Sequence, residues 1–253
     1  MARVRIARSF VRSGPCALVE ELDTSKLAAA TIMSRTPPEI TFETMRASLY
    51  CAVVCDVLDS LGFSEQSPRV SLRPLTANGV LVGRCKTTLW AEMFHEDPQP
   101  YELELRAVDS CQPNDVIIAA AGGSVRSGVW GELLSTAALN RGCVGAIVDG
   151  AVRDTAAMRR LGFPVFARGA CIYDSRDRQR VIDLDVPVEI DGVEFASGDL
   201  VLADDDGVVV VPREVEAQAL RLAWEKVHAE NVGRDEIRGG AKAADVFRKY
   251  GVL

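Results

Sequence analysis

The residues with the clearest capacity for chemistry lie in one short stretch, residues 131–154. Glu132 stands near its start, and Arg153 and Asp154 stand at its end, 21 positions after Glu132. A guanidinium group presents a planar fork that matches a carboxylate. Aspartate and glutamate supply the hard oxygen ligands that Mg²⁺ or Mn²⁺ takes, directly or through retained waters. The pattern therefore predicts a site for a small acid and a divalent cation.

Two helix beginnings, joined by a buried strand, are expected to position these side chains. Apolar residues recur at helical spacing after Gly131, residues 143–148 are apolar and β-branched, and residues 155–161 form a second helical segment closed by Gly162. Amides in the first turn of a helix lack intrahelical partners and attract anions. We therefore expect the substrate carboxylate to meet the first helix and Arg153. The substrate-binding residues predicted there are Gly131, Glu132, Leu133, Leu134 and Arg153.

Each of these residues also has a purely structural interpretation. Asp154 precedes a helix and suits an N-cap, while the helix dipole favours an acid such as Glu132 in a first turn. Arg153 would be unusual as a surface ion-pair residue at the end of a buried strand. The three together favour a site over separate structural roles. By contrast, the acidic run 204–206 is interpreted as a solvated hairpin turn, because Asp206-Gly207 supplies the turn chemistry.

Composition restricts the class of protein. The chain has 253 residues, 48% hydrophobic content and a net charge of −7, which suits one large globular domain with appendages. The negative charge disfavours nucleic-acid binding, and no apolar run approaches the roughly 18 residues that a bilayer span needs. Seven cysteines without a CxxC pair favour a reducing cytoplasm. The arginine-rich start predicts an extension that packs on a neighbouring subunit, with targeting as the alternative.

The chain is predicted to contain an extension at 1–36, an α/β core at 37–215 and a C-terminal helical segment at 216–253. Residues 41–61 show a helical pattern, and a long amphipathic helix is expected over 214–238. Asp-Gly pairs at 191–192 and 206–207 predict two hairpins. Hairpin strands together with helix-linked strands indicate a mixed α/β domain.

The stretch 131–154 resembles the signature of the family that contains 4-hydroxy-4-methyl-2-oxoglutarate aldolases and RraA-like proteins. Weaker similarity runs from about Thr41 to the C-terminus, through 56–62 and 198–212. The resemblance implies a β/β/α swivelling-domain (RraA-like) fold, here with an N-terminal extension and a C-terminal helix. It also implies assembly as a homotrimer or homohexamer.

The resemblance also assigns roles to particular residues. Asp154 would hold Mg²⁺ or Mn²⁺ directly and Glu132 through water, while Arg153 would bind the substrate carboxylate. Glu230 would match a glutamate that reaches the neighbouring subunit's site, with Glu225 as the alternative. The family usually has an acid three residues after the Arg-Asp pair, where this chain has Ala157. That departure implies a different cation environment or a different substrate.

The activity implied is a metal-dependent lyase that cleaves a 4-hydroxy-2-oxo dicarboxylic acid to pyruvate, with oxaloacetate decarboxylation as a side activity. One alternative is a protein-binding regulator without catalysis. Another is a metal-dependent dehydratase of a sugar-derived acid. A Schiff-base route is disfavoured because no lysine lies in the motif, and Lys86 is interpreted as an ordinary edge-strand lysine.

Overall fold

The computed structural model describes residues 40–76 and 79–251, all of which lie in the unit Glu39–Leu253. The extension predicted at 1–36 therefore lies outside the described residues. Within the described ranges every helix is too short or too polar to span a lipid bilayer.

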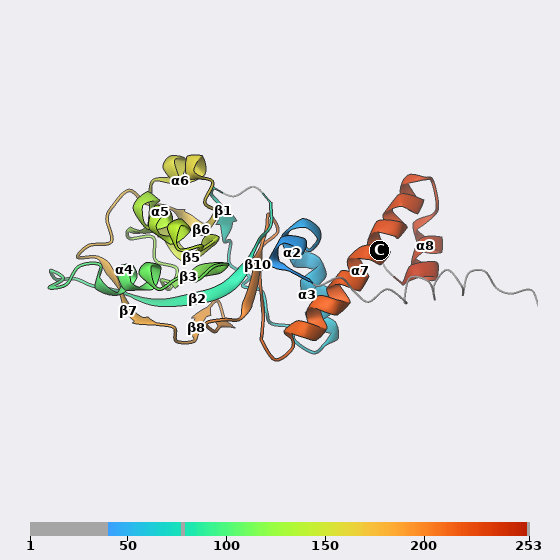
Figure 1. The fold of residues 1–253 in the computed structure, drawn as a ribbon, viewed down its shortest axis with the longest axis horizontal. Coiled ribbons are helices and arrows are strands. Elements are labelled where there is room, and N and C mark those ends of the chain that lie inside the picture. The colour runs from blue at the N-terminus through green and yellow to red at the C-terminus, as the bar shows by residue number, and fades with distance from the viewer. Residues whose placement is uncertain (1–39, 77–78, 252–253) are drawn as a thin grey trace, which may run out of the picture. The chain divides into compact units, whose positions relative to one another are not determined.

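A large mixed sheet organises the described part of the chain (Figure 1). Its main path runs β1-β6-β5-β3-β2-β10-β11, while β4 pairs with β5 and β7 pairs with β2. A separate hairpin is formed by β8 and β9. The strands are β1 (Arg73–Pro74), β2 (Leu81–Glu92), β3 (Asp115–Ala120), β4 (Gly128–Trp130), β5 (Gly145–Val152), β6 (Val165–Ala170), β7 (Gln179–Leu184), β8 (Val188–Ile190), β9 (Val193–Phe195), β10 (Leu200–Ala203) and β11 (Val208–Val211).

The centre of the sheet is parallel and buried on both faces. Strands β2, β3, β5 and β6 pair in parallel, and every residue of β5 is buried. Parallel strands covered on both sides are typically continuous apolar runs, as the sequence of β3 and β5 is. Because the strands are parallel, the segments that follow β4 and β5 leave the sheet at the same edge.

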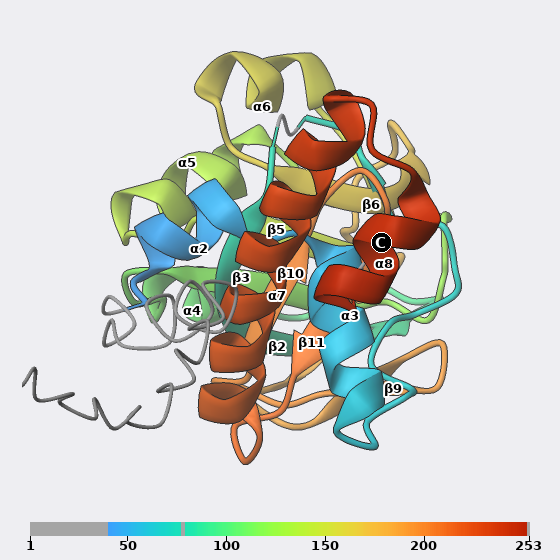
Figure 2. The same ribbon diagram turned by 90° about the vertical axis from the view of Figure 1, so that its right-hand side faces the viewer.

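Helices cover the sheet in two groups (Figures 1 and 2). The first group, α4 (Glu102–Asp109), α5 (Glu132–Asn140) and α6 (Thr155–Leu161), shares one apolar cluster with β3 and β5. The second group, α2 (Phe42–Ser48), α3 (Cys51–Ser60) and α7 (Glu216–Arg238), packs on β10 and β11. Helix α8 (Ala243–Tyr250) packs on α7. The opposite face of the central strands packs against the β8–β9 hairpin.

The predicted mixed α/β class and both Asp-Gly hairpins are confirmed. The single helix predicted over 41–61 is wrong, because α2 and α3 are separated by two residues with extended backbone, Leu49 and Tyr50. Leu49 is buried in the cluster beneath α2 and α3, so tertiary packing overrides a helical pattern that runs through it. The strand predicted at 143–148 begins and ends later, at Gly145 and Val152.

Candidate active site

The two halves of the predicted site follow neighbouring strands. Trp130 at the end of β4 is in register with Val152 at the end of β5, and the Arg153 amide donates a 2.8 Å hydrogen bond to the Trp130 carbonyl. Gly131 and Glu132 therefore emerge beside Arg153 and Asp154, although they are far apart in sequence. They lie together because β4 and β5 pair in parallel, so that their carboxyl ends reach the same edge of the sheet.

Asp154 occupies the N-cap position of α6 but does not cap that helix. Its backbone is left-handed, with φ 57° and ψ 29°, and its side chain makes no capping hydrogen bond to α6. Its Oδ2 instead accepts a 3.3 Å hydrogen bond from the Glu132 amide, at the start of α5. The structural interpretation of Asp154 as the cap of its own helix is therefore wrong. The carboxylate is turned towards the positive end of the other helix.

Gly131 allows this close approach. A Cβ atom built on Gly131 would lie 2.8 Å from Asp154 Oδ2 and 3.2 Å from Arg153 Cγ. Real Cβ atoms do not come that near a carboxylate oxygen, so a larger residue would displace the Asp154 carboxylate. A glycine at this position therefore lets the Asp154 carboxylate keep its place.

Arg153 is half-buried and lies between two carboxylates. Its Nη1 is 2.9 Å from Asp174 Oδ2, and its Nε is 3.9 Å from Asp154 Oδ2. Asp174 also accepts hydrogen bonds from the Tyr101 hydroxyl at 2.9 Å and the Arg176 amide at 3.0 Å. Partial burial tends to raise the pKa of Asp174, but these hydrogen bonds and the Arg153 charge outweigh it and hold the pKa below its ordinary value.

Glu132 completes the group. It is half-buried, and its Oε1 accepts a 2.9 Å hydrogen bond from the Thr136 hydroxyl one turn along α5. Leu133 is 78% exposed, and Leu134 is half-buried. Ala157, in the first turn of α6, brings no charge to the group. The structure thus places Arg153, Asp154 and the backbone amide of Glu132 together at the beginnings of α5 and α6, while the Glu132 carboxylate contacts Thr136.

The donor set suits a hard cation that keeps most of its waters. Asp154 is exposed and Glu132 is partly exposed, so each carboxylate can be reached from solvent. In the described part of the chain, no three His, Cys, Asp or Glu side chains gather closely enough to hold a metal ion. One or two carboxylates with retained water is the way proteins usually bind Mg²⁺, so these residues fit that ion better than zinc.

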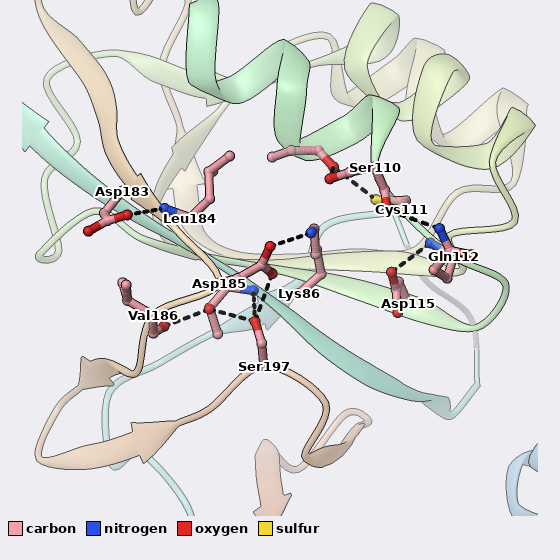
Figure 3. A network of polar contacts seen from close by, with 12 residues as sticks. Lys86, Ser110, Cys111, Gln112, Asp115, Asp183, Leu184, Asp185, Val186 and Ser197 are labelled. Atoms are coloured by element: carbon pink, nitrogen blue, oxygen red, sulfur yellow. Dashed lines mark hydrogen bonds and ion pairs between the residues drawn. The ribbon is translucent and has the colours of Figure 1, made fainter.

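Lys86 is not an edge-strand lysine, and that interpretation is wrong. It lies within β2, which pairs with β3 on one side and with β10 and β7 along the other. Its side chain is only 12% exposed, and its Nζ is 2.7 Å from Asp185 Oδ2 (Figure 3). Asp185 is held in turn by the Ser197 hydroxyl at 3.0 Å. The amine is thus engaged in an ion pair with Asp185.

The acidic turn after β10 combines two environments. Asp205 and Asp206 are exposed, as the solvated-turn interpretation expects, but Asp204 is buried. Its Oδ2 accepts a 2.7 Å hydrogen bond from the Cys51 amide at the start of α3, and its Oδ1 accepts one from the Asp206 amide at 3.0 Å. Asp204 therefore provides a hydrogen-bond acceptor for a free amide at the N-terminus of α3.

Glu230 lies in another part of the chain. It is on α7, where its Oε2 accepts a hydrogen bond from the Tyr50 hydroxyl. Figure 1 shows α7 and the α5–α6 pair on opposite sides of β10. Within one chain, Glu230 is thus separate from Arg153, and its role in a neighbouring subunit's site stays a prediction.

Sequence reasoning missed the groups behind Arg153. Asp174 follows β6, and Tyr101 precedes α4. Neither has a spacing that relates it to the motif, and only the tertiary fold brings them to Arg153.

Comparison with known proteins agrees with this fold. A family described as RraA-like, Aldolase/RraA, matches residues 51–210. A relative from Halalkalibacterium halodurans, provisionally named as a 4-hydroxy-4-methyl-2-oxoglutarate aldolase, is 31% identical over 188 residues, which are 74% of this chain and 84% of that protein. A Thermus thermophilus protein named as 4-hydroxy-4-methyl-2-oxoglutarate aldolase is 35% identical over 97 residues, 38% of this chain and 58% of that protein.

Solved structures show the same relationship. An uncharacterized protein from Pseudomonas syringae pv. tomato superposes with a TM-score of 0.71 and 27% identity, covering 80% of this chain and 90% of that one. Streptomyces coelicolor RraAS2, described as an unusual member of the RNase ES inhibitor RraA family, gives a TM-score of 0.65 and 29% identity over 72% of this chain and 90% of its own.

The mixed sheet, with its acid-and-arginine cluster at two helix beginnings, defines an RraA-like α/β protein. The chain belongs to the RraA-like (Aldolase/RraA) family.

Proposed function

We propose that the protein is a divalent-metal-dependent lyase that cleaves a 4-hydroxy-2-oxo dicarboxylic acid to pyruvate, with oxaloacetate decarboxylation as a side activity. The observation that supports it most is the convergence of Glu132, Arg153 and Asp154 at one edge of the sheet. Relatives named as aldolases add support from outside the chain.

The chain's own residues would bind and orient the acid. Arg153 is partly exposed and is held in place by Asp174 at 2.9 Å, so it can present its guanidinium to a substrate carboxylate at little entropic cost. The amides at the start of α5 would donate to the same anion. Fixed donors of this kind stabilise negative charge as it develops during bond cleavage.

Asp154, directly, and Glu132, through water, would hold the cation. When bound, a divalent cation supplies a Lewis acid that draws electron density from the 2-oxo group. Glu132 keeps its Thr136 hydrogen bond at one oxygen, which leaves its second oxygen available for a water ligand. Assembly as a homotrimer or homohexamer belongs to the same proposal, because the predicted partner acid, Glu230, lies outside its own chain's cluster.

The test measures pyruvate released from 4-hydroxy-4-methyl-2-oxoglutarate and from oxaloacetate, first with Mg²⁺ and then with EDTA. We expect metal-dependent release, and we expect Arg153→Ala to lower kcat/KM by about tenfold to a hundredfold, the worth of a charge-assisted hydrogen bond. Arg160→Ala is the matched control, because Arg160 is an exposed arginine on α6. It should leave kcat/KM unchanged.

Pyruvate release that persists in EDTA, or the absence of turnover across a panel of such acids, would count against the lyase. The second outcome would favour a regulator that binds a protein partner, since RraAS2 is described as a member of an RNase inhibitor family.

A further inference from the structure

A small cavity with several charged and polar lining residues lies between α4 and β7. It has room for about one water molecule. Its lining includes Asp97, Tyr101, Glu104 and Gln179. Gln179 is only 3% exposed, and its Nε2 has no hydrogen-bond partner among the described residues. A buried amide donor without a partner costs free energy unless water or another acceptor meets it.

Glu104 is the unusual group in this cavity. It lies on α4 and is only 7% exposed. Within the described ranges its carboxyl group makes no ion pair, and only burial and the charges of neighbouring residues act on its protonation. The neighbouring charges are Asp174, Arg153 and Asp97.

The charges around Glu104 are already paired. Arg153 is 2.9 Å from Asp174, and Arg180 is 2.9 Å from Asp97. Arg176, which also lines the cavity, lies 3.8 Å from Asp177. An ionised Glu104 would therefore be a buried carboxylate beside two others, with no cation of its own. Burial first, and then the negative charges of Asp174 and Asp97, raise the pKa of Glu104 from 4.5 to about 8, while Arg153 opposes the shift.

We propose that Glu104 is a positioning residue that keeps its proton at neutral pH, so that Arg153 stays paired with Asp174 and retains its attraction for an anion. This inference rests on the proposed function only in that Arg153 is taken to bind a carboxylate. When Glu104 loses its proton, a second carboxylate competes for Arg153 and repels Asp174. The site then becomes less positive, and anion affinity falls. A water in the cavity would accept hydrogen bonds from the Glu104 hydroxyl and from Gln179 Nε2.

Neighbouring groups do not supply the same effect. The Tyr101 hydroxyl donates to Asp174, and burial together with that hydrogen bond and the Asp174 charge raises the pKa of Tyr101 to about 12. Tyr101 therefore stays neutral through the range in which Glu104 titrates. The pKa of Asp174 is lowered, so its carboxylate also stays ionised through the pH range in which Glu104 titrates.

The first test measures binding of oxalate, a small dianion, in the presence of Mg²⁺ between about pH 6 and about pH 9, which spans the pKa of Glu104. The dissociation constant for the unmodified protein should rise several-fold across this range. Glu104→Gln, which mimics the protonated acid, should abolish most of the rise. Asp109→Asn is the matched control, because Asp109 is an exposed acid at the other end of α4. Its dissociation constant for oxalate should change with pH as that of the unmodified protein does.

Equal pH dependence in Glu104→Gln and in the unmodified protein would overturn the proposal. If Glu104→Gln does not fold, infrared difference spectra of the unmodified protein across the same range decide the question. They should show loss of one protonated carboxyl band as pH rises, and its absence would refute the proposal.

The second test measures thermal unfolding against pH without any ligand. Because the pKa of Glu104 is raised in the folded state, the folded protein binds the extra proton and loses stability as pH rises from 4.5 through about 8. Glu104→Gln should therefore gain Tm relative to the unmodified protein as pH rises, and the gain should level off above the folded pKa. A Tm difference that does not change with pH would contradict a proton on Glu104.

The two proposals fail separately. Oxalate binding with the expected pH dependence, but without pyruvate release from any acid, would refute the lyase and uphold the role of Glu104. Metal-dependent pyruvate release together with pH-independent oxalate binding would uphold the lyase and refute the role of Glu104.

Discussion

At the scale of single residues, the backbone conformation of Asp154 bears on the proposed site, because it sets the direction of the carboxylate. A non-glycine residue in the left-handed region costs about 1–3 kcal/mol, and such strain persists where the surroundings enforce it. Here the enforcement comes from the Arg153 amide bound to Trp130 and from the first turn of α6, whose Met158 amide donates to the Asp154 carbonyl at 3.0 Å. The strain turns the Asp154 carboxylate away from its own helix and towards α5.

Gly131→Ala tests whether that orientation matters. The new Cβ would lie 2.8 Å from Asp154 Oδ2 and would push the carboxylate away. We expect kcat/KM for pyruvate release to fall by about tenfold to a hundredfold, because displacements of about 1 Å in a site have effects of this size. The Mg²⁺ concentration needed for half-maximal activity should also rise.

Gly169→Ala is the matched control. Nothing lies within 4 Å of a Cβ built on Gly169 in β6, so activity and Mg²⁺ requirement should stay unchanged. Full activity in Gly131→Ala would show that the contact between Gly131 and Asp154 is incidental.

The members of the motif could be predicted from the sequence because they lie directly after two neighbouring strands. Glu132, Arg153 and Asp154 each follow or begin a regular element, so their spacing carries spatial information. Asp174, Tyr101 and Glu104 lack this property. They reach Arg153 from a loop after β6 and from α4, and only packing against β7 brings those segments there.

At the scale of elements, the turn between β10 and β11 and the start of α3 form one unit. Asp204 caps α3 from a distant part of the chain through its 2.7 Å hydrogen bond with the Cys51 amide. Tyr50, the N-cap residue itself, makes no side-chain capping hydrogen bond. The break between α2 and α3 thus has a tertiary cause, since it leaves the first amides of α3 open to the Asp204 carboxylate.

Asp204→Ala should lower the free energy of unfolding by about 1–2 kcal/mol, the usual cost of losing an N-terminal cap with a buried partner. Urea unfolding at equal protein concentration measures this change. Asp205→Ala, at the exposed neighbouring position, should stay within about 0.5 kcal/mol of the unmodified protein. Added Mg²⁺ should not alter the difference between the variants. A magnesium-dependent difference would show instead that the acidic turn binds the cation.

The same elements show where prediction from sequence succeeds. Both hairpins and the buried strand β5 depend on neighbours in sequence, and Asp-Gly turns or apolar runs report them directly. The interruption at Leu49 and Tyr50 depends on Asp204, which lies more than a hundred residues later. Local periodicity therefore continues through a break that depends on tertiary contacts, namely the burial of Leu49 and the hydrogen bond from Cys51 to Asp204.

At the scale of the whole molecule, the position of Glu230 bears on whether the proposed site lies within one chain. Glu230 faces Tyr50 on α7, on the other side of β10 from α5 and α6 (Figure 1). Tyr50 is held there with its pKa raised to about 12, through burial and then the hydrogen bond and charge of Glu230. If Glu230 serves catalysis, it must do so in a neighbouring copy of the chain.

Mixed oligomers test this directly. Arg153→Ala and Glu230→Ala should each lose most of their activity as pure proteins, because each lacks a different residue of the proposed site. When the two chains are coexpressed in equal amounts, a site that draws Arg153 from one chain and Glu230 from the next regains both residues in about a quarter of cases. Pyruvate release should therefore recover to about a quarter of the unmodified level, because complete sites form only where the two variants adjoin in the required order within a mixed ring. A mixture of Arg153→Ala with Asp154→Ala controls for assembly effects, because both losses fall in one chain's cluster and no combination restores it. Recovery in that control would show that Arg153 and Asp154 act from different chains. No recovery with Glu230→Ala would place the whole site within a single chain.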